Sequence, residues 1–273
     1  MNALLEHPAV QGGVAPFIVA LVVALALART RYAWLAIVAG YLTAVALSSG
    51  ISFSPLTASR KVLLLAIVVA VVGLLLDRAM PKTRTLNWIL AVVAGVAAVW
   101  AFWSVLGQRE GSAAWTATAA VAIFAGVMTL ALLGLRHDPL RVAAATLGLG
   151  IATGVASVLS ASIGFLLAGM AVAAAAGALL LVGIFTSRPP EPGLLGTLAA
   201  GAMIALFAEG ASLLAQMPWY VSALLLLVPL AVRLPVREEW RVFRRAFTLS
   251  LYALAAASIP IAAAWFAARA MPS

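Results

Sequence analysis

The sequence predicts an all-α protein, a bundle of about ten transmembrane helices that forms one domain over residues 1–273. Composition is the first reason, because the chain is 65% hydrophobic and only 9% charged, whereas roughly a quarter of the residues in a soluble domain are charged. Most of the surface of a chain with so few charges has to face lipid or other buried helices. Helices are the expected structure in lipid because their backbone polar groups form hydrogen bonds with one another. Ten apolar runs and an uneven distribution of basic residues are the second and third reasons.

The length of each apolar run can be compared with the thickness of a bilayer, which takes about 20 residues of helix to cross. Most runs have this length. The ninth is short, so eight or nine spans result if the eighth and ninth runs form a re-entrant pair. Residues 142–185 carry no charge and would make a helix of about 65 Å, so the chain has to turn back, at Ser160-Ala161-Ser162. The runs cover 12–28, 33–56, 62–76, 86–106, 113–135, 141–160, 162–185, 194–215, 217–232 and 246–268.

Basic residues gather in every second gap between the runs. The odd-numbered gaps hold two, three, two, one and five of them, thirteen of the 17 Lys and Arg in the chain. Arg60, Lys61, Arg109 and Arg269 occupy the even gaps and the C-terminal end. Cytoplasmic loops carry such an excess, so we expect the odd gaps in the cytoplasm and both termini in the periplasm. The thirteen residues are Arg29, Arg31, Arg78, Lys82, Arg84, Arg136, Arg141, Arg188, Arg233, Arg237, Arg241, Arg244 and Arg245.

The residues that the chain lacks exclude several classes of function. Cysteine is absent and only two histidines exist, so thiolate chemistry is excluded and neither a metal nor a haem site is expected. A phosphate-binding Gly-rich loop and a nucleophile elbow are also missing from the sequence, so we expect no cofactor, no catalytic residues and no enzymatic activity. The net charge of +9 comes from the basic gaps, and nucleic acid is therefore not an expected partner.

An internal repeat is suggested by positions that coincide at an offset of 108 residues, such as Gly40 with Gly148 and Ser49 with Ser157. Runs 2–5 and 6–9 would then be two four-helix repeats in the same orientation, and transporters often place their sites between repeats. A chain rich in Ala, Gly and Ser also produces such matches by chance, so the absence of a repeat stays open as the alternative.

Small residues and prolines within the runs predict details of packing. Gly150 and Gly154 lie four residues apart, which indicates a close contact between two helices. Pro229 and Pro260 lie inside runs or near their ends and predict kinks.

Glu209 is the one acid well inside an apolar run, about 9 Å below the outer boundary if the run is helical. A charge at this depth costs several kcal/mol, so the carboxyl group has to be protonated, paired or in contact with water. One interpretation is a binding or proton-coupling site formed with Ser212 and Gln216. The alternative is a protonated carboxyl group that is hydrogen-bonded to a neighbouring helix through the same two residues.

The longest polar stretch, residues 233–245, is strongly basic. Within and just after it, Trp240, Phe243 and Phe247 follow i, i+3, i+7 spacing, which predicts a short amphipathic helix at the inner headgroup layer. Its arginines would then contact anionic lipid headgroups, and an ordinary topology-setting loop is the alternative. The candidate lipid-binding residues are Arg237, Trp240, Arg241, Arg244 and Arg245.

Acidic and aromatic residues near the ends of the runs are expected at the membrane surface. Asp77 and Asp138 should each form an ion pair with a neighbouring basic residue. Trp100 and Trp103 should face lipid, with stacking on a ligand as the alternative. Five further tryptophans are expected to anchor the helices in the interface: Trp34, Trp88, Trp115, Trp219 and Trp265.

Residues 40–77 and 156–181 resemble polytopic proteins of high-GC proteobacteria in general composition, over about a quarter of the chain, and the likeness implies no activity. We expect the protein in the bacterial inner membrane. Ten short spans are also similar to drug/metabolite transporters, but both termini of those proteins are expected inside, opposite to the charge bias here. We expect a non-enzymatic protein that handles a small or amphipathic solute, or lipid, through a cavity near Glu209. The alternative is a structural or accessory subunit. Its partners would be membrane lipids and other membrane protein subunits.

Overall fold

The structure, a computed structural model, describes residues 6–79 and 83–270, and every regular element in these ranges is a helix. This confirms the predicted fold class, a helical membrane bundle. Lys82, one of the basic residues counted above, lies outside the described residues. The elements are a π-helical turn η1 (Val10–Val14), α2 (Ala15–Ala26), α3 (Leu35–Ser48), α4 (Ala58–Ala79), α5 (Arg84–Leu106), α6 (Gly111–Leu133), α7 (Pro139–Leu159), α8 (Ile163–Thr186), α9 (Gly193–Leu214), α10 (Trp219–Leu225), α11 (Leu227–Ala231) and α12 (Val242–Ala270).

Seven of these helices are long and apolar enough to cross a membrane. Three shorter apolar segments, Val10–Ala26, Leu35–Ser48 and Trp219–Ala231, complete the ten. The last of them is interrupted at Leu226, between α10 and α11. Pro229 explains the interruption, because proline has no N–H to donate and its ring clashes with the carbonyl group four residues earlier. The helix is thus interrupted close to Pro229, whereas α12 continues through Pro260.

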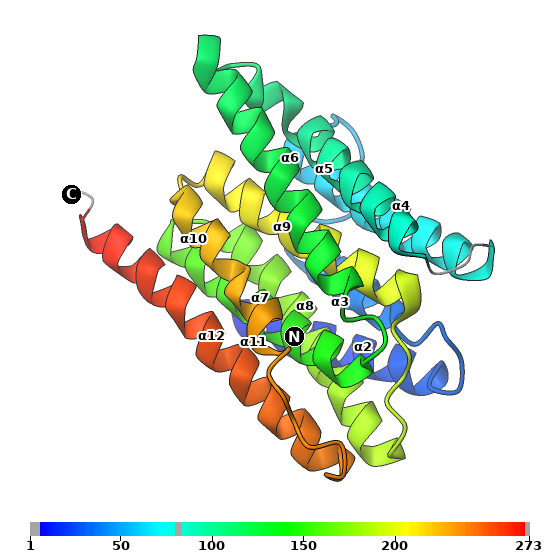
Figure 1. The fold of residues 1–273 in the computed structure, drawn as a ribbon. Coiled ribbons are helices and arrows are strands. Elements are labelled where there is room, and N and C mark those ends of the chain that lie inside the picture. Colours follow the sequence, from blue (N-terminus) through cyan, green and yellow to red (C-terminus); the bar gives the residue numbers. More distant parts are fainter. Residues whose placement is uncertain (1–5, 80–82, 271–273) are drawn as a thin grey trace.

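Helix α9 lies at the centre of the bundle and is buried from Leu194 to Ala211. Figure 1 shows it between α4–α6 on one side and α3, α7 and α8 on the other. The sequence of α9 explains this position, because small and apolar residues occupy every face of the helix. A helix that is apolar on all faces is buried. Glycines let neighbours approach closely: a Cβ atom at Gly196 would lie 2.5 Å from the Trp34 ring, and one at Gly201 would lie 2.9 Å from the Cα atom of Thr129.

The most extensive helix contact is that of α7 with α8, and glycines on both helices form it. A Cβ atom at Gly150 would lie 2.7 Å from the carbonyl oxygen of Gly169, and one at Gly169 would lie 2.7 Å from the amide nitrogen of Gly154. The close contact predicted from Gly150 and Gly154 is thus confirmed. The turn between the two helices is also where the sequence placed it, with Ala161 in the left-handed conformation at φ 62°.

The 108-residue spacing recurs in the helix bounds but not in the helix packing. Shifted by 108, α3, α4, α5 and the start of α6 fall on α7, α8, α9 and α10. However, α7 packs along α8 while α3 barely meets α4, and α5 packs along α6 while α9 barely meets α10. The two sets of four helices therefore do not form equivalent bundles.

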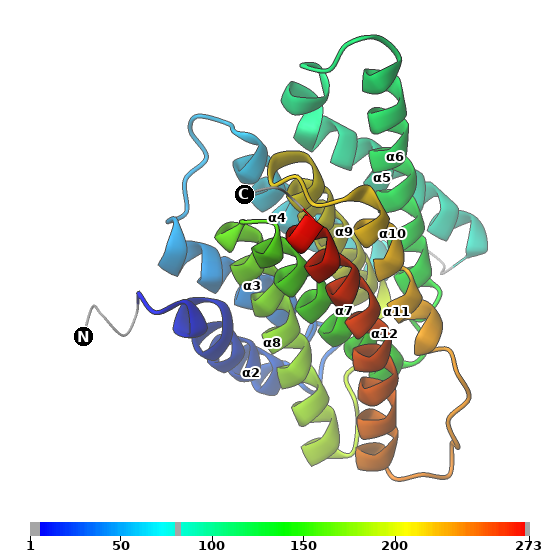
Figure 2. The same ribbon diagram turned by 90° about the vertical axis from the view of Figure 1, so that its left-hand side faces the viewer.

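The connections that carry most of the basic residues meet at one end of the bundle, which we call the basic end. Asp77 joins three of them, because its carbonyl oxygen accepts a hydrogen bond from Arg31 and its carboxylate accepts from the amide nitrogen of Leu194 at 2.8 Å. Asp138 and Arg245 join the other two through an ion pair of 3.2 Å. Figure 2 shows the α8–α9 and α11–α12 connections together at this end, opposite the α3–α4 and α5–α6 connections.

Both aspartates also stabilise the start of a helix. The carboxylate of Asp77 accepts from the first amide groups of α9, and that of Asp138 accepts from the amide nitrogen of Leu140 at the start of α7. A negative charge is favourable there because it meets unpaired N–H groups and the positive end of the helix dipole. The ion pair expected for Asp138 is present, at 3.0 Å from Arg141, and its second partner, Arg245, was not expected.

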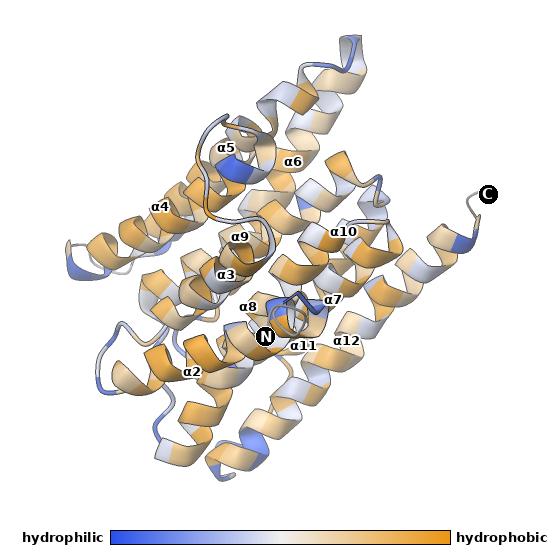
Figure 3. Cartoon of the chain, turned by 180° about the vertical axis from the view of Figure 1, so that it is seen from behind, coloured by the Kyte–Doolittle hydropathy of each residue, from blue (hydrophilic) through white to orange (hydrophobic). Residues whose placement is uncertain are grey.

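Most of the tryptophans expected at the membrane surface are exposed. Hydrophobic residues predominate in the middle of the helices and hydrophilic residues lie mostly toward their ends and in the connections, as the colours in Figure 3 show. Trp34 is the exception, because only 1% of it is exposed and its indole nitrogen donates to the carbonyl oxygen of Pro190 at 2.9 Å. Its ring fills the space left by Gly196, so it joins α3 to α9 instead of anchoring the chain in lipid. The exposed tryptophans are Trp88, Trp100, Trp103, Trp115, Trp219 and Trp265.

Candidate functional site

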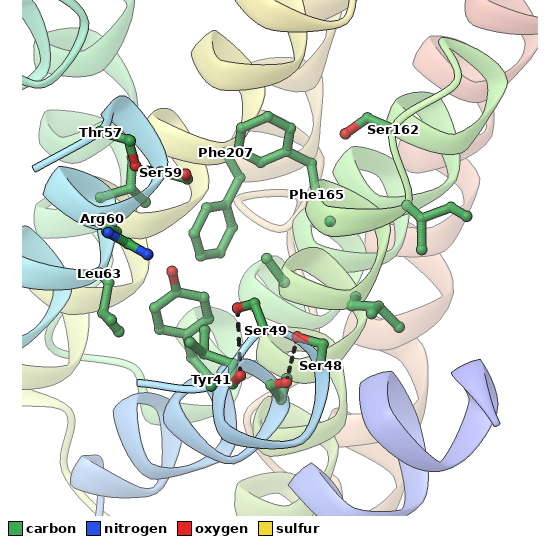
Figure 4. Close-up of a pocket in the computed structure, with 18 of the residues that line it drawn as sticks. Tyr41, Ser48, Ser49, Thr57, Ser59, Arg60, Leu63, Ser162, Phe165 and Phe207 are labelled. Carbon is green, nitrogen blue, oxygen red and sulfur yellow. Dashed lines mark hydrogen bonds between the residues drawn. The ribbon is translucent and has the colours of Figure 1, made fainter. Parts of the chain in front are cut away.

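A cavity of about 770 Å³ opens at the end of the bundle opposite the basic end. It lies among η1, the C-terminal half of α3, the N-terminal parts of α4 and α8, and the C-terminal half of α9. The α3–α4 connection and the turn before α8 form its rim. Figure 4 shows side chains from these separate parts of the sequence facing the same space.

Aromatic rings form the floor of the cavity. Tyr41 of α3 packs against Phe207 of α9, with ring centroids 5.0 Å apart and planes inclined at 44°. Phe165 of α8 reaches the same region because Gly210 of α9 has no side chain. The Phe165 ring occupies the space that a Cβ atom at Gly210 would take. Tyr41 is 4% exposed, yet its hydroxyl has no hydrogen-bond partner among the described residues. Figure 4 shows this hydroxyl pointing into the cavity.

Hydroxyl groups surround the opening of the cavity. Ser48 and Ser49 donate to carbonyl groups of their own helix, at 2.8 and 3.5 Å, which leaves their oxygen lone pairs free to accept. Arg60 is the charged residue of the rim, and one of its terminal nitrogens donates to the carbonyl oxygen of Pro55 at 2.8 Å. The other polar lining residues are Gln11, Ser52, Thr57, Ser59 and Ser162.

Glu209 does not line this cavity. It follows Phe207 by two residues on α9, and at 3.6 residues per turn its side chain points about 200° away from the Phe207 ring. The residue is 7% exposed, and its carboxyl group makes no hydrogen bond within the part of the chain that the structure describes. The cavity expected near Glu209 therefore exists, but on the other side of the helix.

The two residues predicted to accompany Glu209 have other surroundings. The hydroxyl of Ser212 pairs with that of Ser222 on α10 at 2.8 Å. Gln216 lies beyond the end of α9 in the left-handed conformation, φ 56°, and lines a second, smaller cavity of about 410 Å³ beside the α7–α8 turn. The structure thus does not bring Glu209, Ser212 and Gln216 together into one site.

The predicted amphipathic helix is absent from the described residues. Residues 233–241 form turns and bends, and α12 begins only at Val242. Phe243 and Phe247 do share an exposed face, with stacked rings 6.3 Å apart. Among the candidate lipid-binding residues, Arg245 turns inward and donates to Asp138, while Arg237, Arg241 and Arg244 are exposed.

Sequence reasoning missed the floor of the cavity. Tyr41, Phe165 and Phe207 come from three helices and read as ordinary apolar core residues, since nothing in a single sequence indicates that helices so far apart leave a space between them. The sequence contained a weak indication of the polar rim, because the α3–α4 connection is rich in serine. Such residues are more often turn residues than ligands.

No protein-family model and no curated protein matches this chain. The function therefore has to be inferred from the chemistry of the cavity and from the placement of its charges.

Proposed function

We propose that this chain is a non-enzymatic, multi-pass protein of the bacterial inner membrane that handles a small or amphipathic solute through its large cavity. The observation that carries the proposal is the division of the cavity into an aromatic floor and a hydroxyl-rich rim with one arginine. Ligand sites have this composition, apolar walls with a few polar groups that orient the ligand, and volumes of about 300–1,000 Å³.

The orientation of the protein follows from its basic end. Cytoplasmic loops carry an excess of Lys and Arg, and these residues meet at the end of the bundle away from the cavity. The proposal therefore puts the basic end in the cytoplasm and gives the cavity an opening to the periplasm. Since ten helices return the chain to the side where it began, both termini belong on the periplasmic side.

A structural or accessory subunit is the second candidate, and the burial of Glu209 favours it. A transporter that used this acid for coupling would place it on a water-filled path, whereas Glu209 is 7% exposed and lines neither of the two cavities described above. In that case the exposed apolar faces of α5 and α6 would pack against another membrane protein.

Purification in native lipid particles, followed by mass spectrometry of the intact complex, distinguishes the two candidates. The proposal expects a stoichiometric small molecule that is lost when the cavity is blocked. A co-purified membrane protein together with an empty cavity would overturn it in favour of the accessory subunit.

Glu209→Gln tests whether the buried acid couples solute movement to protons. If Glu209 carries the proton, solute uptake into proteoliposomes driven by a pH gradient should fall to the rate without a gradient, because an amide cannot release a proton. Glu110→Gln is the matched control, since Glu110 is exposed and its side chain makes no capping hydrogen bond at the start of α6. Gradient-driven uptake that survives in Glu209→Gln would leave the acid with a structural role only.

A further inference from the structure

Building on the proposed function, we infer that the cavity selects an amphipathic anion, which places a compact anionic group at Arg60 and an apolar body on the aromatic floor. Three observations carry this inference: the charge of the lining residues, the place of Arg60 among the basic residues of the chain, and the Tyr41 hydroxyl that faces the cavity.

The lining of the cavity carries one kind of charge. Among the described residues around it, Arg60 is charged and none is acidic. One terminal nitrogen of the guanidinium donates to Pro55, which leaves further N–H donors for a ligand, since arginine has five. A guanidinium without an acidic partner beside an apolar space favours an anion, and carboxylate, sulfonate and phosphate groups match its fork geometry.

Arg60 also departs from the distribution of basic residues in the chain. The other basic residues at its end of the bundle have a visible structural role or lie free on the surface. Lys61 donates to the carbonyl oxygen of Trp100 and lies 5.1 Å from the centre of its ring, and Arg269 lies 4.5 Å from that of Trp265. Arg109 is exposed on the α5–α6 connection. Arg60 also donates to a carbonyl group, that of Pro55. Among the described basic residues, however, it is the one that lines the cavity, where a bound anion would offset the positive-inside bias against a cation.

Tyr41 supports the same ligand because its hydroxyl can donate a hydrogen bond, whereas the hydroxyls of Ser48 and Ser49 already donate to carbonyl groups of their own helix. The Tyr41 hydroxyl is aimed into the cavity from a residue that is 96% buried and has no partner among the described residues. Because this hydroxyl faces the cavity without a partner from the described residues, a ligand oxygen or a water molecule has to complete its hydrogen bonding. Beneath it, Phe165 and Phe207 offer apolar surface to the body of the ligand.

Three probes that share an eight-carbon chain and differ in charge test the inference: octanoate, octyl glucoside and octyltrimethylammonium. Their binding to the full-length protein in phosphatidylcholine nanodiscs is measured by calorimetry. Octanoate should bind at least about tenfold more tightly than octyltrimethylammonium, the ratio expected for one charge-assisted hydrogen bond. Arg60→Gln should abolish this preference while octyl glucoside binds as before, and Arg60→Lys should keep part of it.

Arg109→Gln is the matched control, because it removes a charge of the same sign from the same end of the bundle without touching the cavity. Equal binding of all three probes, lost for all of them in Ser48→Trp, would overturn the anion inference and leave the proposed function standing. If no probe binds to the unmodified protein, both fail.

Two sources could supply such an anion, a lipid or a free solute, and a second set of nanodiscs separates them. With phosphatidylglycerol in the disc, a lipid occupant would already fill the cavity and octanoate binding would disappear. A cavity that serves a free solute would bind octanoate equally in both discs. Either result supports the anionic class, and only the origin of the anion differs.

Discussion

Gly150→Leu is expected to lower the free energy of unfolding by about 3 kcal/mol, at the upper end of what overpacking a core costs. The new side chain would begin 2.7 Å from the carbonyl oxygen of Gly169 and 2.8 Å from the amide nitrogen of Ala173. These atoms belong to the backbone of α8 and cannot move aside by changing a rotamer. The two helices, which share the most extensive contact of the bundle, would have to separate, and the apparent melting temperature in detergent should fall sharply.

Gly177→Leu on α8 is the matched control. A Cβ atom at this position meets nothing within 4 Å, and leucine favours a helix over glycine by about 1 kcal/mol. We therefore expect no loss, or a small gain, in melting temperature. Equal melting temperatures for the two variants would contradict the close approach of α7 and α8.

Ser48→Trp is expected to weaken solute binding by at least about tenfold, because an indole ring in place of a hydroxymethyl group occupies the space needed by the ligand. Ser48 is exposed, lines the cavity and makes one hydrogen bond, to a carbonyl group of its own helix. The loss of that bond costs little. Binding of the co-purified solute, measured in nanodiscs, should therefore fall while the melting temperature stays within a few degrees of the unmodified protein.

Ser258→Trp provides the same substitution on a surface away from the cavity. Ser258 is also exposed and also donates to its own helix, at 2.7 Å to the carbonyl oxygen of Ala255. Unchanged binding in Ser258→Trp is expected. Unchanged binding in Ser48→Trp as well would mean that the solute occupies a different place on the protein.

Features that follow from lipid physics could be predicted from the sequence alone. The apolar runs predicted ten helical segments because a bilayer accepts few other structures. The uncharged stretch 142–185 required a turn, and the turn lies at residues 160–162 as expected. Gly150 and Gly154 predicted a close contact because four residues bring two side chains to the same helix face.

Features that depend on how helices pack could not be predicted in this way. Trp34 lies near a helix end, and its sequence position alone does not distinguish a lipid anchor from a ring that fills the space beside Gly196. Glu209 was correctly placed in a buried segment, but the direction of its side chain depends on which neighbours surround α9. The cavity floor joins Tyr41 to Phe207, residues that lie far apart in the sequence and carry no motif.

The central claim is that the basic end faces the cytoplasm and the cavity opens to the outside. Because the chain has no cysteine, single-cysteine variants can be labelled without background. Ser49→Cys, on the cavity rim, should react with a membrane-impermeant maleimide in intact cells, whereas Ser187→Cys, in the exposed connection before α9, should react only after the membrane is opened. Labelling of Ser187→Cys in intact cells, with Ser49→Cys protected, would contradict the account.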